Sequence, residues 1–262
     1  MESRPDAVSE CDLLLTGGRV IDPETGLDEV LDVAVTAGVI VAVGSSGLRA
    51  ARTLDVTGRV VTAGFIDLHS HAQNIPSLRL QALDGVTTAL ELESGAGDVR
   101  ASLDRAAAEG RPVNYGYSAS WAQARMEVLD GWSPAGGFLD FTTGIAAKGW
   151  QRPANGDELA KILDRLEDQL AAGALGIGVL VGYAPQTGRN EYLQVASLAA
   201  RHDVPTFTHA RFKNPEEPES ALEGVAAKDQ AHLRDTLRAV LTNITGSSDR
   251  AEAITDMRRA QG

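Results

Sequence analysis

The feature that most restricts the fold of this chain is a change of rhythm at Gly64. After this residue, short apolar segments of strand length alternate with longer segments whose apolar residues recur at helical spacing. Strands separated by helices of this length form right-handed crossover units, which predict a parallel sheet or barrel. The predicted strands are 65–71, 86–93, 112–119, 174–181 and 205–209, and the predicted helices are 77–83, 99–109, 156–173 and 192–202.

The part of the chain before Gly64 follows a different pattern. Residues 11–62 contain short apolar runs, separated by glycine and proline residues that favour turns. We expect strands at 12–16, 19–22, 31–36, 39–43, 53–56 and 59–62. Strands this short and evenly spaced predict a small β-sandwich module. Residues 1–10 are polar, and we expect them to be disordered.

The composition restricts the partners and the compartment. The 262 residues carry a formal net charge of −12, which repels phosphate backbones and anionic membranes, so nucleic acid and membranes are not expected partners. No segment approaches the ~18 consecutive apolar residues of a membrane helix. The single cysteine, Cys11, excludes an internal disulfide and suits a reducing compartment. We therefore expect a cytoplasmic protein that acts on a small molecule.

The first chemically informative residues are Asp67, His69 and His71, at the end of the first predicted strand after Gly64. Alternate residues of a strand share a face, so the three side chains are predicted to point the same way. Two imidazoles at the carboxyl end of a barrel strand can bind one metal ion, because that end forms the mouth of the barrel. A pair of histidines alone is a weak signal, but the apolar approach and the position directly after the β-rich region favour a metal site.

Several motifs in order give this chain a specific resemblance. The segment 64–71 (Gly-Phe-Ile-Asp-Leu-His-Ser-His), following a β-rich module, resembles the amidohydrolase superfamily. Residues 84–95 and 109–116 are similar to the branch of N-acyl-D-amino-acid and N-acyl-D-glutamate deacylases, and residues 173–178 and 208–211 follow in the order of that branch. The resemblance implies a metal-dependent hydrolase of the amide bond of N-acyl-D-amino acids, with a partial TIM-like (β/α) barrel over residues 63–227.

The resemblance also assigns metal ligands. His69, His71 and His209 match the family's histidine ligands, although His209 could instead be a buried histidine bonded to backbone. Related deacylases place a cysteine ligand where this chain has Ser94, and serine is a poor zinc ligand. We therefore expect Glu93 to replace it, with pairing to an arginine as the structural alternative. Zinc is the expected ion, and manganese, cobalt or iron would also accept these donors.

Two further residues are candidates for contact with the substrate. Tyr183 matches a tyrosine that contacts substrate in the family, although an ordinary loop aromatic would look the same. Arg211 follows His209 by two residues and could hold a substrate carboxylate through a bidentate pair. A salt bridge to one of the carboxylates in 216–219 is an equally good interpretation of Arg211.

The chain departs from the family pattern after residue 227. We expect residues 228–262 to form a helical tail, because their apolar residues have helical spacing, and no strand with the family's catalytic aspartate is visible there. The open edges of an incomplete barrel would favour association, including with a second copy of the chain. We therefore expect poor turnover by this chain alone. Two alternatives stay open: a non-catalytic remnant of an amidohydrolase, and an amidohydrolase that acts on a cyclic amide.

Overall fold

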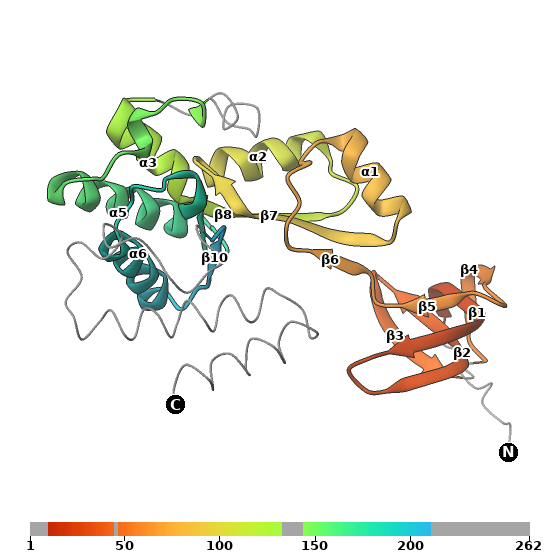
Figure 1. Cartoon of the computed structure of the whole chain (residues 1–262). Helices are drawn as coiled ribbons and strands as arrows, with labels where there is room; N and C mark the ends of the chain where they lie inside the picture. The colour runs from red at the N-terminus through yellow and green to blue at the C-terminus, as the bar shows by residue number, and fades with distance from the viewer. Residues whose placement is uncertain (1–9, 45–46, 133–143, 211–262) are drawn as a thin grey trace, which may run out of the picture. The chain divides into compact units, whose positions relative to one another are not determined.

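A computed structural model describes residues 10–44, 47–132 and 144–210 of the chain (Figure 1). The chain divides between Phe65 and Ile66 into two compact units. None of the helices in the described segments combines the length and apolarity that are needed to cross a membrane.

The first unit is a five-stranded mixed sheet with the strand order β3-β2-β1-β4, and β5 pairs with the far end of β1. The antiparallel strands are β1 (Glu10–Asp22), β2 (Leu27–Thr36) and β3 (Val39–Gly44), whereas β4 (Arg49–Asp55) and β5 (Val60–Thr62) run parallel to β1. Cys11, Leu14 and Ala34 form its small buried core, so the cysteine has a packing role.

The long strand β1 corrects one prediction. A turn was expected at Gly17 between two separate strands, but the strand continues through a register shift between Leu15 and Gly18. Gly17 has a φ of +71°, and a Cβ atom there would lie 2.6 Å from the hydroxyl oxygen of Thr57. Such a bulge bends a strand without ending it, so a turn-forming glycine need not end pairing.

The second unit contains a five-stranded sheet with the order β10-β9-β8-β7-β6. Its strands are β6 (Phe65–Asp67), β7 (Val86–Ala96), β8 (Asn114–Ser120), β9 (Ile177–Val179) and β10 (Thr206–Thr208). The pairs β7–β8, β8–β9 and β9–β10 are parallel. The predicted fold class, a partial parallel barrel preceded by a small β module, is therefore confirmed.

Helices join the parallel strands, as Figure 1 shows. They are α1 (Ile75–Leu83), α2 (Val99–Glu109), α3 (Trp121–Asp130), α5 (Gly156–Ala171) and α6 (Arg189–Arg201), with short 3₁₀ turns at η1 (Gly149–Gln151) and η2 (Val181–Tyr183). Helix α5 begins with a capping box between Asn155 and Glu158 and buries an apolar stripe that includes Ile162 and Leu166. This stripe joins Trp121 and Trp150 in the main hydrophobic core.

Helix α3 was not predicted from the sequence. It begins immediately after β8, where the Ser120 side chain accepts a hydrogen bond from the Gln123 backbone N–H, and it ends at Gly131 in the left-handed conformation. A serine cap and a terminal glycine are recognisable signals for a helix, so this element could have been found. Because α3 follows β8 directly, its first turn lies at the carboxyl end of the sheet.

Candidate metal centre

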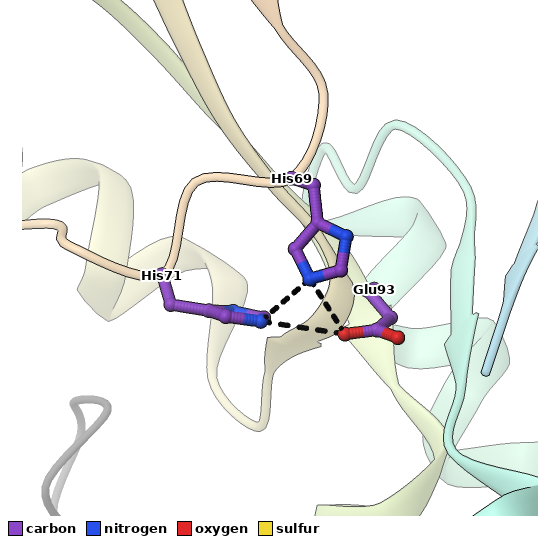
Figure 2. Close-up of side chains that lie close together, drawn as sticks. All are labelled: His69, His71 and Glu93. Atoms are coloured by element: carbon purple, nitrogen blue, oxygen red, sulfur yellow. Dashed lines mark hydrogen bonds and ion pairs between the residues drawn. The ribbon is translucent and has the colours of Figure 1, made fainter. Parts of the chain in front are cut away.

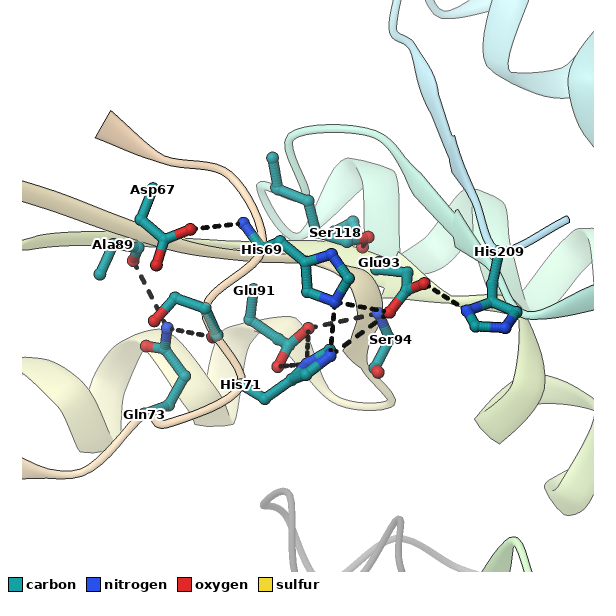
Figure 3. A network of polar contacts seen from close by, with 12 residues as sticks. Asp67, His69, His71, Gln73, Ala89, Glu91, Glu93, Ser94, Ser118 and His209 are labelled. Carbon is teal, nitrogen blue, oxygen red and sulfur yellow. Dashed lines mark hydrogen bonds and ion pairs between the residues drawn. The ribbon is translucent and has the colours of Figure 1, made fainter. Parts of the chain in front are cut away.

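The two histidines of the first motif lie in a loop rather than on a strand. Strand β6 ends at Asp67, and the Asp67 carboxylate accepts a hydrogen bond of 2.9 Å from the His69 backbone N–H. Its other oxygen accepts a bond of 3.4 Å from the Gln81 amide. The prediction that Asp67 shares a face with both histidines is therefore wrong, because its side chain is used to end the strand (Figure 3).

The backbone of this loop is fixed on strand β7. His69 forms an isolated antiparallel bridge with Glu91, and the Ser70 N–H donates to the Leu90 carbonyl at 3.0 Å. The Gln73 amide donates to the Ser70 carbonyl at 2.8 Å and to the Ala89 carbonyl at 3.5 Å. These contacts hold the loop at the site without continuing β6.

The end of β7 brings Glu93 to the same place. The pairing of β7 with β8 shifts register between Glu91 and Ala96, so this stretch is irregular. The Ser118 hydroxyl donates to the Leu92 carbonyl at 2.5 Å. At Gly178 of β9, a Cβ atom would overlap the carbonyl oxygens of Leu92 and Glu93, so only glycine lets the backbones approach this closely.

His69, His71 and Glu93 form a compact cluster of donor atoms, shown in Figure 2. The His69 Nε2 atom lies 2.8 Å from the His71 Nε2 atom and 2.9 Å from Glu93 Oε2, and His71 Nε2 lies 3.3 Å from the same oxygen. The ligand atoms of the cluster all lie within 4.8 Å of one another. The Glu93 side chain is 16% exposed, and that of His69 is 61% exposed, so the cluster opens to solvent through His69.

The donor set fits a divalent metal ion. Tetrahedral zinc binds imidazole nitrogen and carboxylate oxygen at about 2.0–2.2 Å, which separates neighbouring ligand atoms by roughly 3.3–3.6 Å. The three separations in the cluster, 2.8, 2.9 and 3.3 Å, lie at the lower end of this range or up to about half an ångström below it. The two Nε2 atoms and the Glu93 oxygen lie close to one another, and the three contacts between them cannot all be good hydrogen bonds. One metal ion among them would instead accept a lone pair from each of the three atoms.

His209, which follows β10, approaches Glu93 from the other side (Figure 3). Its Nδ1 atom lies 2.6 Å from Glu93 Oε1, whereas His69 and His71 contact Oε2. Tyr183, from η2, lies against His209 with 4.9 Å between ring centroids. Thus three of the histidines selected from the sequence contact Glu93, and Tyr183 contacts one of them, His209. Arg211 lies outside the described residues.

Glu91 is a member of the site that the sequence did not assign. Both of its carboxylate oxygens face the Nδ1 atom of His71, at 2.9 and 3.1 Å. This hydrogen bond is the largest cause that raises the pKa of His71 above its ordinary value of 6.5, and partial burial of the ring opposes it. Two glutamates that face a barrel interior must be paired, and this requirement was the sequence signal for its role.

The raised pKa of His71 predicts opposite pH dependences for stability and metal binding. The protonated ring contributes to stability below pH 6.5, and this contribution is lost as the pH rises through the higher pKa of the folded state. With a chelator present to keep the protein free of metal, we therefore expect the difference in melting temperature between the wild type and His71→Gln to shrink as the pH rises from 6.5 through the pKa of His71 in the folded state. Zinc affinity should rise over the same window, because a ligand imidazole must be neutral. A stability difference that grows with pH would contradict the assignment.

Comparisons with known proteins support an amidohydrolase relationship. The chain is 30% identical over 216 residues to a D-aminoacylase of Alcaligenes xylosoxydans xylosoxydans, a match that covers 76% of this chain and 44% of that protein. It is also 46% identical over 65 residues to a dihydroorotase of Geobacter metallireducens, covering 24% of this chain and 15% of that enzyme. No family model matches the chain.

Solved structures give the same result for the fold. An N-acyl-D-glutamate deacylase from Bordetella bronchiseptica, in complex with zinc and a phosphonate inhibitor, superposes with a TM-score of 0.64 and 23% identity, over 78% of this chain and 46% of that one. A D-aminoacylase that defines a subset of amidohydrolases superposes with a TM-score of 0.59 and 25% identity, over the same shares.

The chain thus spans less than half the length of the relatives that it matches. The match to the D-aminoacylase nevertheless includes most of this chain. By sequence and by fold, the chain is related to the D-aminoacylase branch of the amidohydrolase superfamily, over the part of those proteins that it spans.

Proposed function

We propose that this protein is a hydrolase that uses a divalent metal ion, zinc, to cleave the amide bond of N-acyl-D-amino acids of the N-acyl-D-glutamate type. The observation that carries the proposal is the convergence of two imidazole Nε2 atoms on one carboxylate oxygen, at 2.9 and 3.3 Å. The parallel strands β7 and β8 place this convergence at their carboxyl ends, where barrel enzymes carry their active sites.

His69, His71 and Glu93 would hold the ion. A bound divalent ion would supply a Lewis acid for an amide carbonyl and a nucleophile at neutral pH. Glu93 provides negative charge at the site, and its second oxygen fixes the His209 ring. Zinc is proposed because borderline imidazole nitrogen and carboxylate oxygen are donors that it accepts readily.

Tyr183 and Arg211 are proposed to select the substrate. Tyr183 is 45% exposed and lies against His209, so its ring can contact a molecule that occupies the open side of the cluster. Arg211 follows His209 by two residues in the sequence. A guanidinium can bind a carboxylate through two parallel hydrogen bonds, which suits an acidic amino acid as the product.

The activity can be tested with the purified chain. We expect zinc-dependent hydrolysis of N-acetyl-D-glutamate and much slower hydrolysis of its L-enantiomer, because the proposed branch is selective for D-amino acids. The cluster in the described segments contains no aspartate, and a positioned general base contributes ~10²–10⁴-fold to a rate. We therefore expect the rate to lie below the ~1–10³ s⁻¹ of ordinary enzymes. A His69→Ala variant should show no hydrolysis.

The assay also separates the competing interpretations. The short match to dihydroorotase favours a cyclic amide as a second candidate substrate, so dihydroorotate is assayed in parallel. Zinc-dependent hydrolysis of dihydroorotate alone would replace the proposed substrate class. Absence of hydrolysis of every substrate in a zinc-loaded sample would contradict the proposed function and favour a non-catalytic protein.

A further inference from the structure

Glu91 lies behind the metal cluster rather than in it. The residue is 4% exposed, and its two oxygens lie 2.9 and 3.1 Å from His71 Nδ1. The Ser94 backbone N–H donates to Glu91 Oε1 at 3.2 Å. Thus the carboxylate is anchored on its own strand and presents both oxygens to the ring nitrogen that faces away from the cluster (Figure 3).

This contact determines what the opposite nitrogen can do. A neutral imidazole carries one proton, and a carboxylate that accepts a hydrogen bond from Nδ1 keeps the proton on that atom. The lone pair is then on Nε2, which lies 2.8 Å from His69 Nε2 and 3.3 Å from Glu93 Oε2. Without Glu91, the proton could move to Nε2 and block metal binding.

We propose that Glu91 is a positioning residue that sets the tautomer and the orientation of His71 for metal binding. The proposal rests on the proposed function, because it concerns the same cluster. Outer carboxylates of this kind raise the basicity of ligand histidines and hold their rings in place. The two glutamates of β7 therefore have different roles in this proposal. Glu93 faces the ion site, and Glu91 faces His71.

The backbone supports the same assignment. Glu91 is paired with His69 in the isolated bridge, and Leu90 accepts from the Ser70 N–H at 3.0 Å. The residue that holds the His71 ring through its side chain therefore also lies opposite His69 in the backbone pairing. Both histidines are thus held against one stretch of β7, His69 through the backbone pairing around Glu91 and His71 through the Glu91 side chain.

The experiment compares Glu91→Gln with the wild type by titrating zinc against a chromophoric chelator. The amide keeps the size of the side chain but loses the charge, so we expect zinc affinity to fall by ~10–100-fold. The matched control is Glu167→Gln, which removes an exposed carboxylate that lies 2.8 Å from His202 Nε2. The control should bind zinc like the wild type. Wild-type affinity in Glu91→Gln, with the fold intact by circular dichroism, would overturn the proposal.

A second measurement keeps the proposal separate from the proposed function. The ¹⁵N chemical shifts of the imidazoles, with His71 assigned by its loss in His71→Gln, report the tautomer in metal-free wild-type protein. We expect the neutral His71 ring to carry its proton on Nδ1. If the wild type binds no zinc, the proposed function fails, while this readout still tests Glu91. A proton on Nε2 would overturn the role of Glu91 even if zinc binds, because this readout is taken on the wild-type protein.

Discussion

Replacing Glu93 by glutamine is expected to remove zinc binding at micromolar protein concentrations. Glu93 provides the carboxylate oxygen on which both imidazoles converge, at 2.9 and 3.3 Å. An amide oxygen carries no charge and binds zinc weakly, and the histidines alone leave two neutral donors. The loss should therefore exceed the ~10–100-fold that removal of an outer contact costs.

Elemental analysis after gel filtration and a zinc titration would measure this loss. The matched control is Glu127→Gln, because Glu127 forms a partly exposed pair with Arg165 at 2.8 Å and lies on α3 rather than in the cluster. This variant should retain wild-type stoichiometry. Zinc bound equally by Glu93→Gln and the wild type would show that the ion is held elsewhere in the chain.

The same titration determines the contribution of His209. Its Nδ1 atom contacts the Glu93 oxygen that faces away from His69 and His71. If His209 only orients Glu93, His209→Ala should weaken zinc by ~10–100-fold and leave the stoichiometry unchanged. A fall from two ions to one would instead show that Glu93 bridges two ions, with His209 holding the second.

Much of the fold could be predicted because local signals agreed with the tertiary structure. The alternation after Gly64 gave the parallel strands and four of the helices, and helix α5 in particular has a capping box and a strong apolar stripe. The His-x-His spacing identified His69 and His71, two of the three residues of the cluster. Glu93 was selected because the neighbouring Ser94 stands where related deacylases have a cysteine ligand and serine binds zinc poorly, and the structure pairs Glu93 with three histidines.

Other features depend on contacts that are distant in the sequence. The end of β6 is set by the Asp67 side chain, which competes with strand pairing for the His69 N–H. The partner of His71 Nδ1 lies 20 positions away, on a strand whose irregular pairing decides where its side chains point. Alternation along a strand cannot predict such a bulge, so the separate tasks of Glu91 and Glu93 were not visible in the sequence.

Replacement of Arg125 by methionine is expected to destabilise the second unit by about 3–5 kcal/mol, because it leaves a buried carboxylate without its charge partner. The Arg125 side chain is 0% exposed, and its Nη1 atom lies 2.5 and 2.6 Å from the two oxygens of Glu191. Arg125 also donates to the Trp150 carbonyl at 2.9 Å and to the Arg152 carbonyl. One guanidinium thus joins α3, η1 and α6.

Tryptophan fluorescence during urea unfolding would measure this effect selectively. All three tryptophans of the chain, at positions 121, 132 and 150, lie in the second unit, so the signal does not report on the β module. Trp121 contacts the pair directly, since its Nε1 donates to Glu191 at 2.9 Å and the guanidinium carbon lies 5.0 Å from its ring centroid. The control, Arg165→Met, breaks a partly exposed pair and should cost about 0–1 kcal/mol.

A double variant tests whether the buried charge causes the loss. Glu191→Gln keeps an acceptor for Trp121 and removes the carboxylate that would be stranded without Arg125. If the stranded charge dominates, Arg125→Met with Glu191→Gln should be more stable than the sum of the single losses predicts, by ~1–3 kcal/mol for groups in direct contact. If the two stability losses simply add, the loss in Arg125→Met comes instead from the missing hydrogen bonds to the Trp150 and Arg152 carbonyls. The ion pair would then serve only to hold the helices at the carboxyl ends of β8 and β9.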